Sequence, residues 1–381
     1  MPTPLGLALE DLLPLIANHE RNYPEAYPEE SIRALYDAGI IAGPFAEEFG
    51  GRGMKLVEAV GVLETIASVS PSVALIASMP LGLAGIYGLD NDVAPDTHRL
   101  AFAEQTARVA ADYRLGRLYA ACNSEKGAGG SLAATKTTAA LQSDGVFALS
   151  GEKILASAGR HAATFFSSAK VSTDDLPGAG VVEFFLVDVA SEGVEILNDW
   201  DGFGMRPTES HTVRYNAARA REIVAFPDFV NLVQPLEYFF CLFAAIPLGC
   251  AKAILCAMAS PAPQSPALRL RLAEATMRYE AMRAYLLQTA EGFRPRAGAA
   301  YAARVLRTKT YVSQEATKLC AELFALGGGR NYRRTSLVAR MLADSFAGTA
   351  LRPPLALALD RLIENFSLGD AESHLTVDGS S

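Results

Sequence analysis

The chain has 381 residues, of which 50% are hydrophobic and 20% are charged, so it can bury a large core and is long enough for two or three domains. A formal net charge of −8 without any run of Lys or Arg argues against nucleic-acid binding. The five cysteines lack C-x-x-C spacing, which indicates neither a disulfide framework nor a zinc site, so we expect a globular protein in a reducing, cytoplasmic setting without a metal.

Residues 1–117 have the pattern of an α-helical domain. From Glu10 onward, hydrophobic side chains recur at helical spacing, as at Leu12, Leu13 and Ile16, and glycines such as Gly39 provide the stops. Residues 1–8 lack the basic and apolar regions of a signal peptide, so no export is expected.

Residues 118–226 have a different pattern, which predicts a compact β-domain of the barrel or sandwich type. Short β-rich runs at 146–149, 164–171 and 181–189 are separated by Asp-Gly, Pro-Gly and Glu-Gly turns. Within this part, Trp200 is the only tryptophan of the chain, and we expect it to be a packing residue.

Residues 227–368 return to helical spacing and predict a four-helix-type bundle. One helix carries its apolar side chains on a single stripe, formed by Leu268, Leu272, Ala275, Tyr279, Met282 and Leu286. The apolar run 238–259 is interrupted by Pro247, Gly249 and Lys252, which favours a buried core helix over a membrane span. Residues 369–381 are polar and aperiodic and are expected to be a mobile tail, so the fold class is α+β.

A polar turn broken by glycines, at residues 123–131, is the most informative part of the β-rich section. Its small residues, Gly127 to Gly130, let main-chain N–H groups converge on an anionic or carbonyl-rich ligand. A second polar turn follows the next β-run and ends at Ser157. By itself, such a turn more often only reverses the chain.

The order and spacing of these segments resemble the middle domain of the acyl-CoA dehydrogenase family, which has Thr-Glu-Pro-x-Ala-Gly-Ser-Asp followed by Gly-x-Lys-x-x-Ile-Thr. Ser124-Glu125, Ala128-Gly129, Gly151, Lys153 and Ser157 stand at the matching positions. Three further segments resemble family motifs in family order: residues 45–53, residues 204–210, and residues 328–332 followed by Arg340 and Asp344.

The resemblance implies an α-domain, a β-domain and an α-bundle that assembles as a dimer of dimers, with FAD between the β-domain and the bundle. It implies that Asn123 and Ser124 bind the N1/O2 edge of the flavin ring and that Ser157 faces the N5/O4 edge. The full implied cofactor-binding set is Asn123, Ser124, Gly129, Gly130, Ser131, Leu155, Ala156, Ser157, Gly328 and Gly329. Contacts to the adenine half are weaker than in the family, because Gly130-Ser131 replaces Ser-Asp and the Arg- and Gln-containing linker is shortened.

The catalytic base that the family uses is missing from this sequence. Eight residues beyond Asp344, where the family has its Glu, stands Arg352, and the alternative family position is Phe239. A guanidinium cannot accept a proton at working pH. The catalytic residue is thus unidentified; Glu237 is a candidate substitute, although a solvated or structural Glu competes with that interpretation.

Arg206, Phe239 and Arg352 are the candidate substrate contacts; for Arg206 a salt bridge within the β-domain is an equal alternative. Three functions remain open. The chain is an FAD-dependent oxidoreductase acting on an acyl substrate, with a CoA thioester as one option; or a flavin-dependent monooxygenase on the same fold; or a catalytically incomplete partner of a paralogue in a hetero-oligomer. A dimer or tetramer is expected, and no membrane partner.

Overall fold

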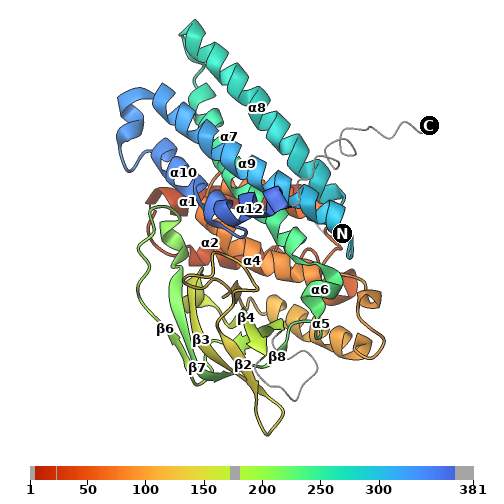
Figure 1. Ribbon diagram of the computed structural model, residues 1–381. Helices are drawn as coiled ribbons and strands as arrows, with labels where there is room; N and C mark the ends of the chain where they lie inside the picture. Colours follow the sequence, from red (N-terminus) through yellow and green to blue (C-terminus); the bar gives the residue numbers. More distant parts are fainter. Residues whose placement is uncertain (1–4, 23, 172–180, 365–381) are drawn as a thin grey trace, which may run out of the picture.

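The computed structural model describes residues 5–22, 24–171 and 181–364, and it has helices at both ends of the chain and a sheet between them (Figure 1). The first helices are α1 (Leu5–Asn22), α2 (Glu29–Asp37), α3 (Leu56–Ala67), α4 (Pro71–Tyr87) and α5 (Arg99–Arg114). All residues of α4 are buried. Its start is fixed by Ser70, whose hydroxyl accepts a hydrogen bond from the Val73 amide at 3.3 Å, and by Pro71 in the first turn.

The strands of the middle section form one sheet. They are β1 (Tyr119–Ala121), β2 (Thr138–Leu141), β3 (Phe147–Ala156), β4 (Thr164–Val171), β5 (Val182–Asp188), β6 (Val194–Ile196), β7 (His211–Arg219) and β8 (Glu222–Ile223). Their order is β6-β7-β3-β2-β4-β5-β8, and β1 adds to β4 in parallel. The β-domain expected from the sequence is formed by this eight-stranded sheet, which has its own core around Leu149, Phe165, Phe185 and Val213.

The last helices are α6 (Phe229–Val233), α7 (Leu236–Ala259), α8 (Pro266–Glu291), α9 (Ala299–Leu326), α10 (Leu337–Ser345), α11 (Ala347–Ala350) and α12 (Leu355–Glu364). The predicted apolar stripe lies on α8: Leu272, Ala275, Met282 and Leu286 are buried, and Leu268 and Tyr279 are partly buried against the core. The stripe thus packs as expected for a bundle helix.

Helix α7 is long and apolar enough to cross a membrane by length and composition, but 83% of its apolar window is buried inside the protein. It packs against α3, α4, α8, α9 and α10, which makes it the central helix of the core, as the interruptions in its sequence predicted. Gly249 permits the close crossing with α3, because a β-carbon there would overlap the Glu64 carbonyl oxygen and the Ala67 side chain.

The observed order of helices, sheet and helices is the predicted α+β architecture. The proposed limits at residues 117 and 226 fall between α5 and β1 and between β8 and α6. The expected tail at 369–381 lies outside the described residues.

Candidate functional site

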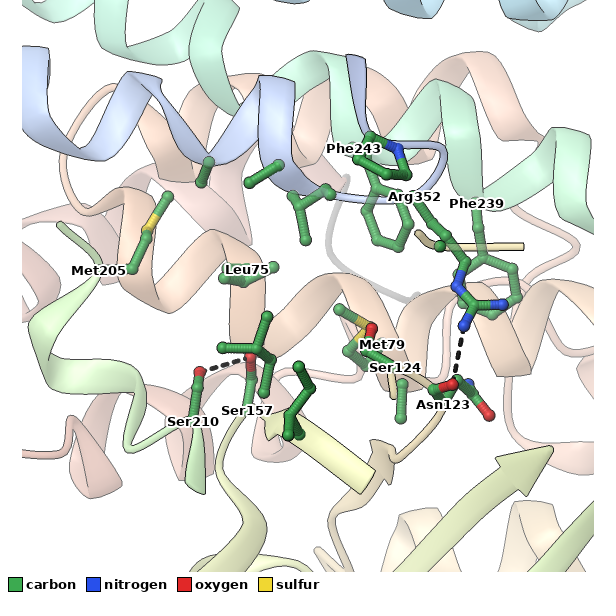
Figure 2. Close-up of a pocket in the computed structure, with 18 of the residues that line it drawn as sticks. Leu75, Met79, Asn123, Ser124, Ser157, Met205, Ser210, Phe239, Phe243 and Arg352 are labelled. Carbon is green, nitrogen blue, oxygen red and sulfur yellow. Dashed lines mark hydrogen bonds between the residues drawn. The ribbon is translucent and has the colours of Figure 1, made fainter. Parts of the chain in front are cut away.

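A cavity of about 520 Å³ lies where the sheet meets α4, α7 and the segment from α10 to α12 (Figure 2). Figure 2 shows Asn123, Ser124, Ser157 and Ser210 on the side of the sheet, and Phe239, Phe243 and Arg352 opposite them. Ser124 and Ser157, the two residues on which the flavin interpretation depends, both line this cavity. The volume falls in the range of ordinary small-molecule and cofactor sites.

The two turns that carry these serines are joined to each other. The amide of Ile154 donates to the Ser124 carbonyl oxygen at 2.8 Å. The register of β3 against β7 shifts between Lys153 and Ala156, and Leu155 has a φ of 59°, so the strand bends just before Ser157. This irregularity places residues 154, 155 and 157 on the cavity wall, while Ala156 packs fully buried in the core of the sheet.

Asn123 ties the turn to strand β4. Its side-chain oxygen accepts a hydrogen bond from the Ser168 amide at 2.7 Å, so that oxygen is not free for a ligand. The Ser124 hydroxyl, in contrast, makes no hydrogen bond with any residue that the structure describes and is available to donate or accept.

A chain of three hydroxyl groups leads from the cavity into the wall. The Oγ atoms of Ser157 and Ser210 are 2.9 Å apart, Ser210 Oγ is 2.7 Å from Thr208 Oγ1, and Thr208 donates to the Met205 carbonyl oxygen at 2.8 Å. Each hydroxyl has one proton and the carbonyl can only accept, so Ser210 must donate to Thr208 and Ser157 to Ser210. The Ser157 oxygen therefore has its proton committed and offers the cavity a hydrogen-bond acceptor.

Glu125 lines the cavity but belongs to a buried ion pair with Lys153. Lys153 Nζ lies 2.6 Å from Glu125 Oε1, and the two side chains are 0% and 3% exposed. Glu125 Oε2 accepts a hydrogen bond from the Lys136 amide at 2.6 Å. Burial works to raise the pKa of Glu125, but the hydrogen bonds and charge of its partners outweigh it and hold that pKa below its usual value. Glu125 is thus a fixed carboxylate anchor for the turn.

The glycines of the turn allow a close approach to the C-terminal segment. Gly129 and Gly130 have φ values of +57° and +81°, and a β-carbon at Gly130 would overlap the Pro354 ring. Only a residue without a side chain adopts this conformation at this contact without strain. Gly129 and Gly130 also line the cavity, so a ligand there meets the backbone of the turn without an intervening side chain.

The opposite wall is aromatic and apolar. Phe239 and Phe243 extend from α7, and the Phe239 ring lies over α4 at Gly82, where a β-carbon would overlap it. The same ring is 5.9 Å from the ring of Phe166 on β4. Leu75 and Met79 of α4 complete this part of the wall.

Arg352 enters the cavity from the segment between α11 and α12 (Figure 2). Its Nη2 donates to the Asn123 carbonyl oxygen at 2.7 Å, while its Nη1 is buried without a hydrogen-bond partner among the described residues. Burial lowers the pKa of Arg352 to about 10, which leaves the guanidinium charged at neutral pH. Lys309 of α9 holds the segment by donating to the carbonyl oxygens of Leu351 at 2.7 Å and Pro353 at 2.6 Å.

The remaining wall is formed by the turn before β7. Asp344 of α10 accepts a hydrogen bond from the Met205 amide at 2.6 Å, which fastens this turn to the C-terminal helices. Trp200 lines the cavity and donates its indole N–H to the Arg206 carbonyl oxygen at 3.0 Å. Phe203, which is 78% exposed, meets Phe346 with ring centroids 6.1 Å apart. Trp200 is therefore a wall residue as well as a packing residue.

The structure brings together most of the predicted site residues. The predicted residues that line the cavity are Asn123, Ser124, Gly129, Gly130, Leu155, Ser157, Phe239 and Arg352. Those placed outside its wall are Ser131, Ala156, Arg206, Glu237, Gly328 and Gly329.

Two of the outlying residues have clear surroundings of their own. Arg206 is exposed and pairs with Glu25 at 3.4 Å, so the salt-bridge alternative describes it, although the partner is not in the β-domain. Glu237 is one residue from Leu236, which lines the cavity, but its own Oε2 is buried without a partner among the described residues, and burial raises its pKa. Gly328 and Gly329 begin the short helix η5 (Gly328–Tyr332) after α9.

Three residues that shape the site were not singled out from the sequence. In the sequence, Asp344 is marked only by its place in a family-like motif, and Lys309 has no local pattern that marks it as buried. Gly82 did carry a signal, because a glycine in the interior of a helix often marks a close approach by another element.

Comparisons with known proteins agree along the chain. Family models match at residues 6–91 (acyl-CoA dehydrogenase, N-terminal domain), 120–218 (middle domain) and 257–351 (C-terminal domain). A probable acyl-CoA dehydrogenase YngJ of Bacillus subtilis (strain 168) is 24% identical over 339 residues, 84% of either chain. L-evernosamine nitrososynthase of a Micromonospora species is 28% identical over 230 residues, 58% of this chain and 51% of that protein.

Solved structures share the fold. KijD3 in complex with FMN and a dTDP-linked amino-keto sugar has a TM-score of 0.81 at 20% identity, covering 99% of this chain and 96% of that one. Butyryl-CoA dehydrogenase of Megasphaera elsdenii has a TM-score of 0.79 at 20% identity, covering 96% and 99%. Dibenzothiophene monooxygenase (TdsC) of Paenibacillus sp. A11-2 has a TM-score of 0.79 at 19% identity, covering 96% and 97%.

Proposed function

The chain belongs to the acyl-CoA dehydrogenase family, and on that basis we propose that it is a flavin-dependent monooxygenase that oxidises a small molecule in the cavity. The observation that carries this proposal is the charge pattern of the wall. A guanidinium, Arg352, stands where the family counts its catalytic Glu, and the carboxylate that does line the cavity, Glu125, is committed to Lys153.

This pattern disfavours dehydrogenation of an acyl thioester. That reaction removes a weakly acidic proton and needs a base within hydrogen-bond reach. Among the described residues of the wall, the Arg352 guanidinium cannot accept a proton, and Glu125 already accepts hydrogen bonds from Lys153 and from two backbone amides. A reaction with reduced flavin and oxygen does not require such a base.

The cofactor we propose is FAD. Ser124, Ser157 and the Gly129–Gly130 backbone fit the ring half, because they offer hydroxyl groups and uncovered main chain beside an apolar cavity. Gly328 and Gly329 lie outside the cavity wall, so in this proposal the adenine half is held with the help of a second copy of the chain. FMN, which is bound in the KijD3 complex, is the alternative that needs no such help.

When bound, the reduced flavin would supply two electrons, so that one atom of O₂ enters the substrate and the other leaves as water. The residues of this chain bind the flavin and shield the reacting atoms from water. The rings of Phe239 and Phe243 exclude water from the side opposite the serines, and Ser157 presents its oxygen as an acceptor for a ring N–H.

One observation favours dehydrogenation as a second candidate. Glu237 has a buried, unpartnered carboxylate oxygen next in sequence to a wall residue, and its pKa is raised, as expected of a base in an apolar site. A movement at the start of α7 would be needed to bring it to the cavity.

The test begins with the visible spectrum of the purified full-length chain and with titration by FAD and by FMN. Faster oxidation by O₂ of reduced flavin on the protein than of free flavin, with no anaerobic bleaching by acyl-CoAs, supports the monooxygenase. The opposite outcome is anaerobic bleaching by acyl-CoAs that disappears in Glu237→Gln. If that bleaching persists in the control Glu291→Gln, at an exposed position of α8, the protein is a dehydrogenase and the monooxygenase proposal is wrong. Failure to bind either flavin without a paralogue would point to the incomplete partner subunit.

A further inference from the structure

Arg352 carries a positive charge that the protein itself leaves without a counter-ion. Its Nη2 is bonded to a neutral carbonyl oxygen, Asn123 O at 2.7 Å, and its Nη1 is buried with no partner in the described part of the chain. None of the ion pairs within 4 Å that the structure describes includes Arg352. An unpaired buried charge is costly unless an anion joins it.

The nearest buried charges do not cancel it. Glu125 attracts Arg352, but Glu125 is the partner of Lys153, whose Nζ is 2.6 Å from Oε1. Glu125 and Lys153 compensate each other, so no carboxylate is left over for Arg352, and the charge of Arg361 adds to the repulsion that Arg352 experiences. A negatively charged ligand would compensate the Arg352 charge.

The guanidinium is held in place before any ligand arrives. Lys309 Nζ donates to the carbonyl oxygens of Leu351 and Pro353, one residue on either side of Arg352. The hydrogen bond from Nη2 to Asn123 fixes the far end of the side chain. Less conformational entropy is therefore lost when the guanidinium binds an anion.

The rest of the cavity wall is largely aromatic and therefore favours a ligand whose remaining surface is apolar. Phe166, Phe184, Phe239 and Phe243 line the same cavity as Arg352. These surroundings combine one anion-binding group with aromatic surface.

We propose that the Arg352 guanidinium binds the carboxylate of the substrate, which makes the substrate class a small hydrophobic carboxylic acid. A carboxylate is preferred over a phosphate because Arg352 is the only cationic side chain among the described residues that line the cavity. This inference rests on the proposed function only in taking the cavity as the place where substrate binds.

The test compares a carboxylic acid with its neutral amide, phenylacetate and phenylacetamide, by calorimetric titration of the full-length protein with and without flavin. Trp200, the only tryptophan, lies in the cavity wall and gives a second signal by fluorescence. A charge-assisted hydrogen bond predicts that the acid binds about tenfold tighter or more. Arg352→Met should remove the preference, Arg352→Lys should keep part of it, and Arg206→Met, an exposed site outside the wall, should leave it unchanged.

Equal binding of acid and amide, retention of the preference in Arg352→Met, or binding of neither probe at millimolar concentration would overturn the inference. So would inorganic phosphate displacing phenylacetate more strongly than acetate does. If Arg352→Met fails to fold, Arg352→Gln retains an amide donor for Asn123 and serves instead. Flavin binding without acid preference contradicts this inference alone, whereas acid preference without flavin binding contradicts the proposed function alone.

Discussion

Two buried ionisable side chains behind the cavity wall have unusual pKa values in opposite directions. Burial raises the pKa of Asp344 from 3.8 to about 7 and lowers that of Lys309 from 10.5 to about 7. Both side chains can keep their hydrogen bonds when they are neutral. Asp344 accepts a hydrogen bond from the Met205 amide, and Lys309 donates to two carbonyl oxygens. Their protonation therefore affects the stability of the fold rather than its geometry.

These shifts predict a dependence of stability on pH with two limbs. Between pH 3.8 and about 7 the folded state retains a proton on Asp344 that the unfolded state has lost, so the free energy of unfolding falls as pH rises. Between about 7 and 10.5 the unfolded state retains a proton on Lys309 that the folded state has lost, so the free energy rises with pH. Urea denaturation across this range measures both limbs.

Variants separate the two contributions. Asp344→Asn should flatten the dependence of the free energy of unfolding on pH below about 7, and Lys309→Met should flatten it above about 7. Asp360→Asn and Lys318→Met, at exposed positions, should leave both slopes unchanged. If the fall in stability between pH 3.8 and about 7 persists unchanged in Asp344→Asn, other carboxylates cause it. Glu20, whose pKa is also raised by burial, is then the next residue to replace.

At the scale of elements, the crossing of α4 and α7 sets the shape of the apolar wall. Gly82 and Gly85 of α4 face the rings of Phe239 and Tyr238 of α7, and a β-carbon at either glycine would overlap the facing ring. The position of Phe239 in the cavity thus depends on a residue that is not part of the cavity wall.

Gly82→Ala is therefore expected to destabilise the protein by about 1–3 kcal/mol through overpacking and to weaken ligand binding by displacing the Phe239 ring. The matched control is Gly61→Ala on α3, where a β-carbon meets nothing within 4 Å; it should stabilise by up to about 1 kcal/mol through helix propensity. Denaturation midpoints and ligand titration measure both effects.

Adding Phe239→Leu to Gly82→Ala should recover part of the lost stability, because a smaller side chain makes room for the methyl group. If the two losses simply add, the Phe239 ring and Gly82 are not in close contact, and Gly82 does not set the position of the ring.

The sequence allowed much of the architecture to be predicted, because helical and strand periodicities are local. The buried stripe of α8 and the core role of α7 follow directly from spacing. Motif spacing also placed Ser124, Ser157 and Arg352 on one cavity. Contacts between distant segments could not be predicted: Lys309 lies 42 residues from Leu351, and Asp344 lies 139 from Met205. Helical spacing does separate Phe239 from Glu237, because residues two apart on α7 lie on different faces, and only Phe239 lines the cavity.

At the scale of the whole molecule, the cavity joins all three parts of the chain. Its wall includes Met79 from the first helices, Ser124 from the middle section, and Phe243 and Ala347 from the last helices. A ligand bound there contacts each part and stabilises their mutual packing.

Flavin at one hundred times its dissociation constant should consequently raise the free energy of unfolding by about 2.7 kcal/mol. The shift should have the same size whether unfolding is followed by Trp200 fluorescence, which reports the middle section, or by far-UV circular dichroism, which is dominated by the helices. A shift seen by fluorescence alone would mean that the ligand contacts only the sheet.

The hydroxyl chain from Ser157 through Ser210 to Thr208 ends on a peptide carbonyl, which has no proton to release and no capacity to pass one on. The hydroxyl chain consequently cannot carry a proton beyond Thr208. A proton released while a ligand is transformed is therefore not carried from Ser157 along these hydroxyl groups into the interior.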